Sequence, residues 1–128
     1  MSYRVIVCGS RTWKDDIRVK VEICALVTHY GDVTVVHGDC PKGADSHARR
    51  WAADRGAKEE RHPADWNKHG RGAGFIRNQE MADAGADLCL AFCNGATPGT
   101  QDMMRRAHKK GIKTKFLMPG IAWQEYRE

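Results

Sequence analysis

The chain has 128 residues, of which 41% are hydrophobic, and a formal net charge of +5 at pH 7. This length predicts one domain, residues 1–128, and the absence of an apolar run of about 18 residues excludes a membrane-spanning helix. The positive charge favours anionic partners without distinguishing a nucleotide from DNA. The N-terminal residues lack a secretory pattern, and an odd number of cysteines, five, fits free thiols in a reducing compartment. We therefore expect a cytoplasmic protein.

Strand and helix patterns alternate along the chain. Tyr3–Cys8 predicts a first strand, and its continuous apolar run indicates that the strand is covered on both faces. The segments from Val33 to Gly38 and at Asp87–Cys93 predict two further strands. Ile112–Met118 predicts a fifth strand. The charged segment Ala57–His62 is a poor strand by composition, and it suits the edge of a sheet.

The predicted helices lie between these strands. The first is capped by Asp15 or Asp16, carries Ile17, Val21, Cys24 and Ala25 on one stripe, and ends at Tyr30–Asp32. The second runs from Ala44 to Gly56, and after a long connection, Pro63–Gly74, a third covers Phe75–Ala84. A fourth covers Thr100–Lys110 and ends at Gly111, and the tail from Ile121 predicts a short last helix.

This alternation predicts a right-handed βαβ series, an α/β three-layer Rossmann-like sandwich with a parallel sheet of about five strands in the order 3-2-1-4-5. Ligands of such sheets bind at the carboxyl ends of the strands, where the chain reverses direction between the first and fourth strands. The loops at that place are Gly9–Thr12, Gly38–Ala44 and Asn94–Thr100. All three contain glycine, which predicts one shared ligand site.

The loop Gly38–Gly43 is the leading candidate for binding a phosphate. A tight turn that leads into a helix exposes backbone N–H groups at the positive end of the helix dipole. The loop has the spacing of a P-loop, but Ala44-Asp45 replaces the lysine and hydroxyl that nucleotide triphosphate hydrolysis requires. Gly70-Arg71-Gly72-Ala73-Gly74 lacks the dinucleotide fingerprint, and no histidine pair has zinc spacing. We expect no metal and no cofactor.

Several side chains near these turns have both a binding and a structural interpretation. Arg11 and Lys42 suit a phosphate, although either could be a surface residue, and Ser10 could donate to the same phosphate or close its own turn. Asp39 could bind a ribose hydroxyl or brace the loop. Asp45 could cap the second helix, and Trp66 could stack on a base or pack on the domain.

The turns together resemble the YspA-type branch of the SLOG superfamily, which is named for Smf/DprA and the Lonely Guy enzymes. The resemblance covers about residues 4–117 and combines five motifs. They are Cys8-Gly9-Ser10-Arg11-Thr12-Trp13, His37 to Asp45, Ala64-Asp65-Trp66, Gly72-Ala73-Gly74-Phe75-Ile76-Arg77-Asn78 and Pro98-Gly99-Thr100. It implies turns that hold a nucleotide or a nucleotide-derived ligand such as an ADP-ribose derivative.

The relatives imply three functions. The first is a sensor, carrier or sequestering module for such a ligand, and the superfamily implies that subunits can pair. The second is the N-glycosidic phosphoribohydrolase activity of Lonely Guy enzymes, whose motifs resemble Arg77–Met81 and Thr97–Asp102 here, with Arg77 and Asp102 in the catalytic positions. The third is binding of single-stranded DNA, as in DNA-processing protein A, through paired arginines on the second and fourth helices.

The predicted ligand-binding residues therefore gather at the three turns and the start of the third helix. They are Gly9, Ser10, Arg11, Gly38, Asp39, Lys42, Gly43, Asp45, Trp66, Asn78, Gly99 and Thr100.

Overall fold

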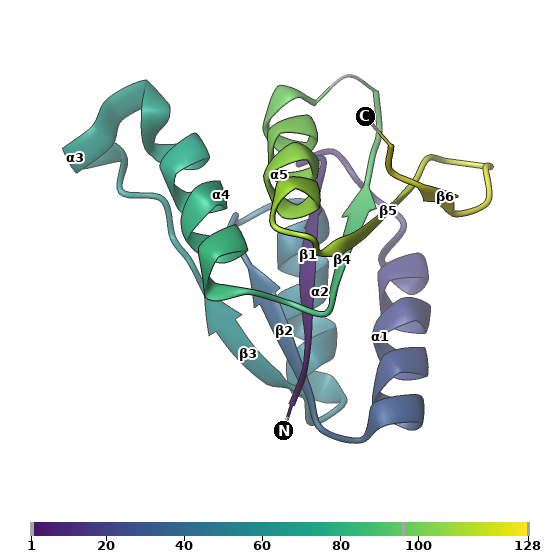
Figure 1. Cartoon of the computed structure of the whole chain (residues 1–128). Coiled ribbons are helices and arrows are strands. Elements are labelled where there is room, and N and C mark those ends of the chain that lie inside the picture. The colour runs from purple at the N-terminus through teal and green to yellow at the C-terminus, as the bar shows by residue number, and fades with distance from the viewer. Residues whose placement is uncertain (1, 96, 128) are drawn as a thin grey trace.

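The computed structural model describes residues 2–95 and 97–127, and it places a mostly parallel sheet between two layers of helices (Figure 1). Residue 96, in the predicted turn 94–99, and the ends of the predicted domain, residues 1 and 128, lie outside the described part. The strands are β1 (Tyr3–Gly9), β2 (Val33–His37), β3 (Lys58–Arg61), β4 (Leu88–Phe92), β5 (Lys113–Leu117) and β6 (Gln124–Glu125), and the helices are α1 (Asp16–Tyr30), α2 (Ala44–Asp54), α3 (Trp66–His69), the 3-10 turn η1 (Gly70–Gly72), α4 (Ala73–Ala84) and α5 (Pro98–Lys109).

The sheet order is β3-β2-β1-β4-β5-β6, so the predicted Rossmann-like order of the first five strands is confirmed. These five strands pair in parallel, and β6 pairs antiparallel with β5. The short helix predicted from Ile121 is wrong, because the tail returns along β5. Trp123 holds the tail in this position. Its ring packs edge-on against Phe92, with 5.4 Å between the ring centroids, and its indole N–H donates to the Glu22 carboxylate at 2.7 Å.

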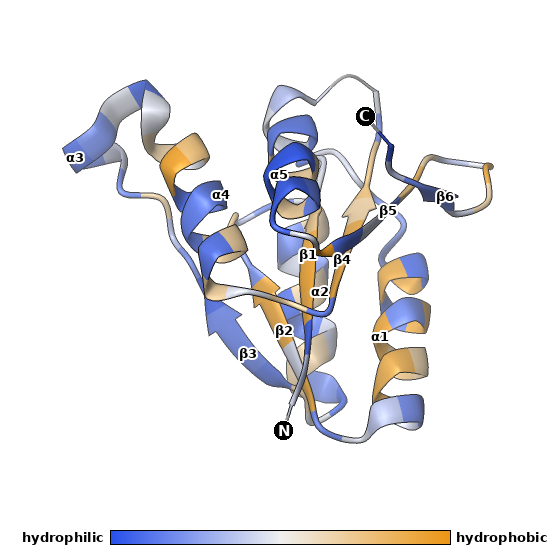
Figure 2. Cartoon of the chain, in the orientation of Figure 1, coloured by the Kyte–Doolittle hydropathy of each residue, from blue (hydrophilic) through white to orange (hydrophobic). Residues whose placement is uncertain are grey.

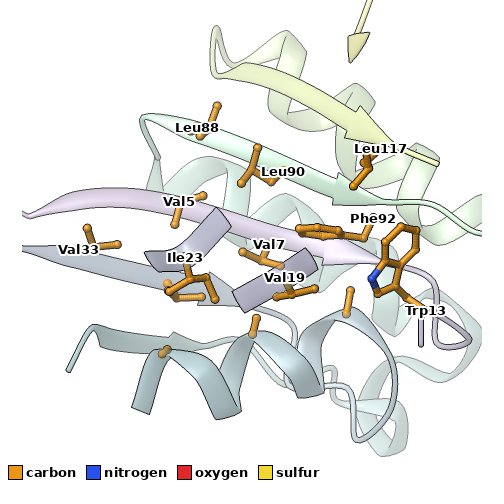
Figure 3. Close-up of a cluster of buried hydrophobic side chains, with 14 residues drawn as sticks. Val5, Val7, Trp13, Val19, Ile23, Val33, Leu88, Leu90, Phe92 and Leu117 are labelled. Atoms are coloured by element: carbon orange, nitrogen blue, oxygen red, sulfur yellow. The ribbon is translucent and has the colours of Figure 1, made fainter. Parts of the chain in front are cut away.

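Alternate residues of β1 enter two separate hydrophobic clusters, one on each face of the sheet. Val5 and Val7 pack with α1 and α2, whereas Ile6 and Cys8 pack with α4 and α5. The first cluster, drawn in Figure 3, ends at the contact of Trp13 with Phe92. The continuous apolar run of β1 is therefore buried on both sides, as its sequence predicts.

The predicted apolar stripe of α1 does not face the sheet. Ile17 and Val21 are 55% and 51% exposed, whereas Val19 and Ile23 are almost fully buried. The helix carries apolar residues on two sides, so periodicity alone cannot say which side packs. Asp15 fixes the start of the helix by accepting the Arg18 N–H at 3.1 Å, and the strand connections then decide which side meets the sheet.

The connection after β3 contains more structure than the sequence predicts. Residues 66–72 form α3 and η1, and α4 begins at Ala73, two residues before the predicted start. The Asp65 carboxylate caps α3 by accepting the Lys68 N–H at 3.0 Å. In Figure 1 this segment projects from the upper left of the sheet, so it can border a ligand site without joining the core.

Strand β3 lies at one edge of the sheet, as its charge predicts, and it is blue in the hydropathy colouring of Figure 2. Glu60 of this strand forms an ion pair with Arg4 of β1, which lies beyond β2 in the sheet. Both guanidinium nitrogens of Arg4 donate to Glu60 at 2.8 Å, and His62 lies 2.7 Å from the same carboxylate. Hydrogen bonds from Arg4, and then from His62, lower the pKa of Glu60 from 4.5 to about 2.

The Arg4–Glu60 pair predicts a specific loss of stability in acid. The pKa of Glu60 is lower in the folded chain than in the unfolded chain, so its contribution is complete above about pH 4.5 and is lost as the pH falls towards 2. We expect Glu60→Gln to cost roughly 1 kcal/mol at pH 7, because the pair is partly screened by solvent. Urea unfolding at pH 7 and pH 2.5 should show the difference from wild type shrinking in acid, and an equal difference at both values would contradict the assignment.

Candidate functional site

The carboxyl ends of β1, β2 and β4 lie at the upper edge of the sheet in Figure 1. Residues at and just after these strand ends line a cavity of about 560 Å³. This volume lies in the range of small-molecule sites. The lining comes from all three predicted turns and from the segment around α3 and α4. The residues are Cys8, Gly9, Ser10, Arg11, Thr12, Gly38, Asp39, Cys40, Pro41, Asp45, Pro63, Ala64, Trp66, Arg77, Asn78, Met81, Asn94, Thr97, Pro98, Gly99, Thr100 and Met103.

The turns after β1 and β4 are joined by Ser10 and Asn94. The Asn94 N–H donates to the Ser10 hydroxyl oxygen at 2.8 Å, and the Asn94 side-chain amide approaches Thr12 at 3.3 Å. Ser10 is 1% exposed, so its hydroxyl closes the floor between the two turns. The exposed Arg11 lines the rim of the same cavity.

The turn after β2 is held by a buried histidine that the sequence analysis did not select. His37 is fully buried: its Nδ1 accepts the Asp39 N–H at 2.9 Å, so Nε2 carries the proton towards Glu59, 2.6 Å away. Asp39 is the one non-glycine residue with positive φ (57°) among those described, and its carboxylate accepts from Arg49 at 3.2 Å. The sequence signal that could have identified His37 is a polar residue at the end of an apolar strand, directly before Gly38.

Asp45 lies in the first turn of α2 and reaches back over the same loop. It is 8% exposed, and one carboxylate oxygen accepts the Cys40 N–H at 3.2 Å. Burial raises the pKa of Asp45, while His37, the Cys40 N–H and Arg77 oppose that rise. The backbone amides that sequence reasoning assigned to a phosphate are thus partly used by the protein's own carboxylate.

Arg77, on α4, connects the turn after β2 with α5. One of its guanidinium nitrogens donates to the Gly38 backbone carbonyl at 2.7 Å, and its Nε donates to the side-chain oxygen Oδ1 of Asn78 at 3.0 Å. The Asn78 amide donates in turn to the Gly99 carbonyl at 3.2 Å and to Asp102 at 3.1 Å. This chain of bonds fixes the guanidinium at the wall of the cavity.

Asp102 lies behind the cavity wall, although the resemblance pairs it with Arg77. Its side chain is 5% exposed, and its two oxygens accept from Arg105 and Arg106, each at 2.7 Å. With the Asn78 amide, three donors surround this carboxylate. Asp102 therefore has the environment of a structural ion-pair centre.

The N-terminus of α5 opens into the cavity. Thr97, its N-cap, makes no side-chain capping bond, and Pro98 occupies the first turn. Gly99 and Thr100 both line the cavity. The first N–H groups of a helix have no partner inside it, so this end of the cavity presents free donors and the positive end of a dipole.

The structure brings together most of the predicted site residues and leaves three outside the cavity. Lys42 is exposed and does not line the cavity, Gly43 packs against the turn after β1, and Asp102 is buried among arginines. The other predicted residues line the cavity: Gly9, Ser10, Arg11, Gly38, Asp39, Asp45, Trp66, Arg77, Asn78, Gly99 and Thr100. His37 and Asn94, which position the turns, were not predicted.

Residues 3–69 match the family described as "YspA, cpYpsA-related SLOG family". The chain belongs to that family. Over 116 residues it is 45% identical to the Gene 61 protein of Mycobacterium phage D29, covering 85% of this chain and 91% of the relative. The resemblance that the motifs indicate is thereby confirmed.

Two solved structures share the fold of this SLOG family member. The molybdenum cofactor binding protein from Rippkaea orientalis has a TM-score of 0.72 at 18% identity, over 92% of this chain and 77% of its own. The molybdenum cofactor carrier protein of Chlamydomonas reinhardtii has a TM-score of 0.63 at 16% identity, over 91% and 76%. At these identities the comparison establishes the fold alone.

The described residues contain neither a membrane-spanning helix nor a metal-binding cluster. No helix among them is long and apolar enough to cross a membrane. Within residues 2–95 and 97–127, no group of three or more His, Cys, Asp or Glu side chains could hold a metal ion. The five cysteines are free, and Cys8, Cys89 and Cys93 are buried.

Proposed function

We propose that this SLOG family member, as one domain, binds a nucleotide or nucleotide-derived small molecule and acts as a carrier, sensor or sequestering module. The observation that carries the proposal is that three turns, far apart in the sequence, line one cavity of about 560 Å³. Such a cavity is large enough for a nucleotide and lies at the strand ends where open α/β sheets bind ligands.

The anionic group of the ligand would lie at the α5 end of the cavity. There the uncapped helix N-terminus offers Gly99 and Thr100, and Arg11 lines the cavity. Arg77 lies on the wall between this end and the turn after β2, because it donates to Gly38 and is linked through Asn78 to Gly99. The loop after β2 suits an anion less well, because the Asp45 carboxylate already accepts the Cys40 N–H and would repel a phosphate.

The surroundings of Asp102 favour binding over hydrolysis of the glycosidic bond. A carboxylate that activates water or stabilises an oxocarbenium ion must reach the sugar. Asp102 lies outside the cavity, and its oxygens are held by Asn78, Arg105 and Arg106. The names of the two fold neighbours, a binding protein and a carrier protein, agree with this choice.

The paired arginines give little support to the DNA-binding alternative. Arg105 and Arg106 both donate to Asp102, and Arg49 donates to Asp39. Guanidinium groups that neutralise internal carboxylates contribute less to contacts with a phosphate backbone.

The proposal is tested by native mass spectrometry and calorimetry of the purified protein with ADP-ribose and the common nucleoside monophosphates. We expect 1:1 binding that weakens about tenfold or more when the phosphate is removed, or when Arg77 is replaced by alanine. Arg55→Ala is the matched control, because Arg55 lies at the far end of α2, paired with Asp54. Binding that is insensitive to both changes would contradict the proposal, and release of free base would favour the phosphoribohydrolase.

A further inference from the structure

Asp45 is a buried carboxylate with spare hydrogen-bonding capacity inside the cavity. An ionised carboxylate can accept about four hydrogen bonds. Among the described residues, hydrogen-bond geometry accounts for one, from the Cys40 N–H, and the Gly38 N–H also favours the ionised form. A carboxylate that is 8% exposed and only partly satisfied carries a cost that a ligand donor would relieve.

The cavity that Asp45 lines also contains an aromatic face that suits a flat heterocycle. The indole of Trp66 lines the cavity and is 51% exposed, so its face is available for stacking. A Cβ on Gly74 would lie 3.5 Å from the Trp66 ring and 3.7 Å from the Arg77 guanidinium, so these two groups border the same space. Arg77 also donates to the Gly38 carbonyl and influences Asp45 electrostatically.

The two ends of the cavity therefore have opposite preferences. The α5 end offers N–H groups without intrahelical partners, whereas the Asp45 end offers acceptor oxygens from a negative group. A ligand that matches both ends is anionic at one end and presents only hydrogen-bond donors at the other. This arrangement discriminates between heterocycles by the edge that they show to Asp45.

The geometry points to a 2-amino-4-oxopyrimidine edge, the edge shared by guanine and pterin, as the group that Asp45 recognises. This inference rests on the proposed small-ligand site and names the class of ligand that it takes. The ring N–H and the exocyclic amino group of that edge are parallel donors that one carboxylate accepts together. Hypoxanthine retains only the ring N–H, and adenine places a ring-nitrogen lone pair towards the carboxylate.

The test compares phosphorylated ligands that differ at this edge. Calorimetry with GMP, IMP and AMP should give GMP an advantage of about 10-fold or more over the other two, since a site built for a donor rejects analogues that lack it. Neopterin phosphate carries the same edge on a pterin. Tight binding by neopterin phosphate with weak binding by GMP would keep the assignment of the edge and identify pterin as its source.

Two variants connect the preference to Asp45. Asp45→Asn retains an oxygen for the Cys40 N–H but replaces one acceptor by a donor, so it should remove the advantage of GMP over IMP. Asp54→Asn, at the last residue of the same helix and outside the cavity, makes the same change in charge and should leave that ratio unchanged. Thermal unfolding of both variants establishes that they are folded.

Failure of this inference is distinguishable from failure of the proposed function. Equal affinity for GMP, IMP and AMP, or a GMP preference that survives Asp45→Asn, would overturn the role of Asp45 while leaving a nucleotide site. Binding of ADP-ribose without measurable binding of GMP or neopterin phosphate would do the same. Absence of binding by every phosphorylated probe would overturn both.

Discussion

Replacing Gly43 by alanine is expected to lower the free energy of unfolding by about 3 kcal/mol or more. Gly43 has φ 74° and ψ −147°, a region that only glycine populates readily. A Cβ there would overlap the Ser10 carbonyl oxygen and lie 2.5 Å from the Arg11 Cα. Both neighbours are backbone atoms, so relief requires the turns after β1 and β2 to separate, and ligand binding should be lost with them.

Gly85→Ala is the matched control for this prediction. Gly85 has φ 85° and ψ 153°, a comparably restricted conformation, but no atom of the described residues lies within 4 Å of the position of its Cβ. It should therefore cost only the backbone strain, about 1 to 2 kcal/mol. Urea unfolding of both variants measures the difference, and equal losses of stability would show that the two turns do not pack as closely as described.

Replacing Asp102 by alanine is expected to cost about 2 to 4 kcal/mol of unfolding free energy in the absence of any ligand. The change leaves the Asn78 amide and two arginines without the carboxylate that they share. The expected loss of unfolding free energy is lower than for a fully buried ion pair, because the side chain of Arg105 is 50% exposed.

Asp83→Ala provides the comparison for Asp102. Asp83 pairs with Lys110 at 2.9 Å, but its side chain is 53% exposed, so its removal should cost much less unfolding free energy than the removal of Asp102. Similar losses for the two variants, measured by denaturant unfolding, would contradict the structural role of Asp102. A stable Asp102→Ala protein that had lost glycosidic cleavage would restore the catalytic interpretation.

Most of the fold could be predicted because its signals are local. The unbroken run Val5–Val7 indicates a strand covered on both faces, and the charges of Glu59 and Glu60 place β3 at an edge. The prediction of the fold failed for two segments that could each pack in more than one way. Helix α1 has two apolar sides, and either could have packed against the sheet. The tail around Trp123 pairs with the edge of β5 and packs on Phe92, so it forms β6 rather than a helix.

The site was less accessible to sequence reasoning than the fold. The sequence indicated which turns would meet, since parallel strands bring their carboxyl ends to one edge. It could not indicate that Asp45 folds back onto the Cys40 amide, or that Lys42 is exposed and does not line the cavity. These outcomes depend on side-chain directions after a tight turn, which a pattern of residue types does not specify.

The amino-acid sequence by itself determined the strand and helix alternation, the family and the three glycine-bearing turns, because each is encoded within a few neighbouring residues. Only the tertiary structure decided which polar groups remain available to a ligand. Asp102 is enclosed by Asn78 and two arginines, whereas Asp45 keeps acceptor capacity inside the cavity. Both are acids in the first half of a helix. Their positions in the sequence do not distinguish them; the hydrogen-bonding partners that packing brings to each carboxylate make Asp102 structural and leave Asp45 able to bind.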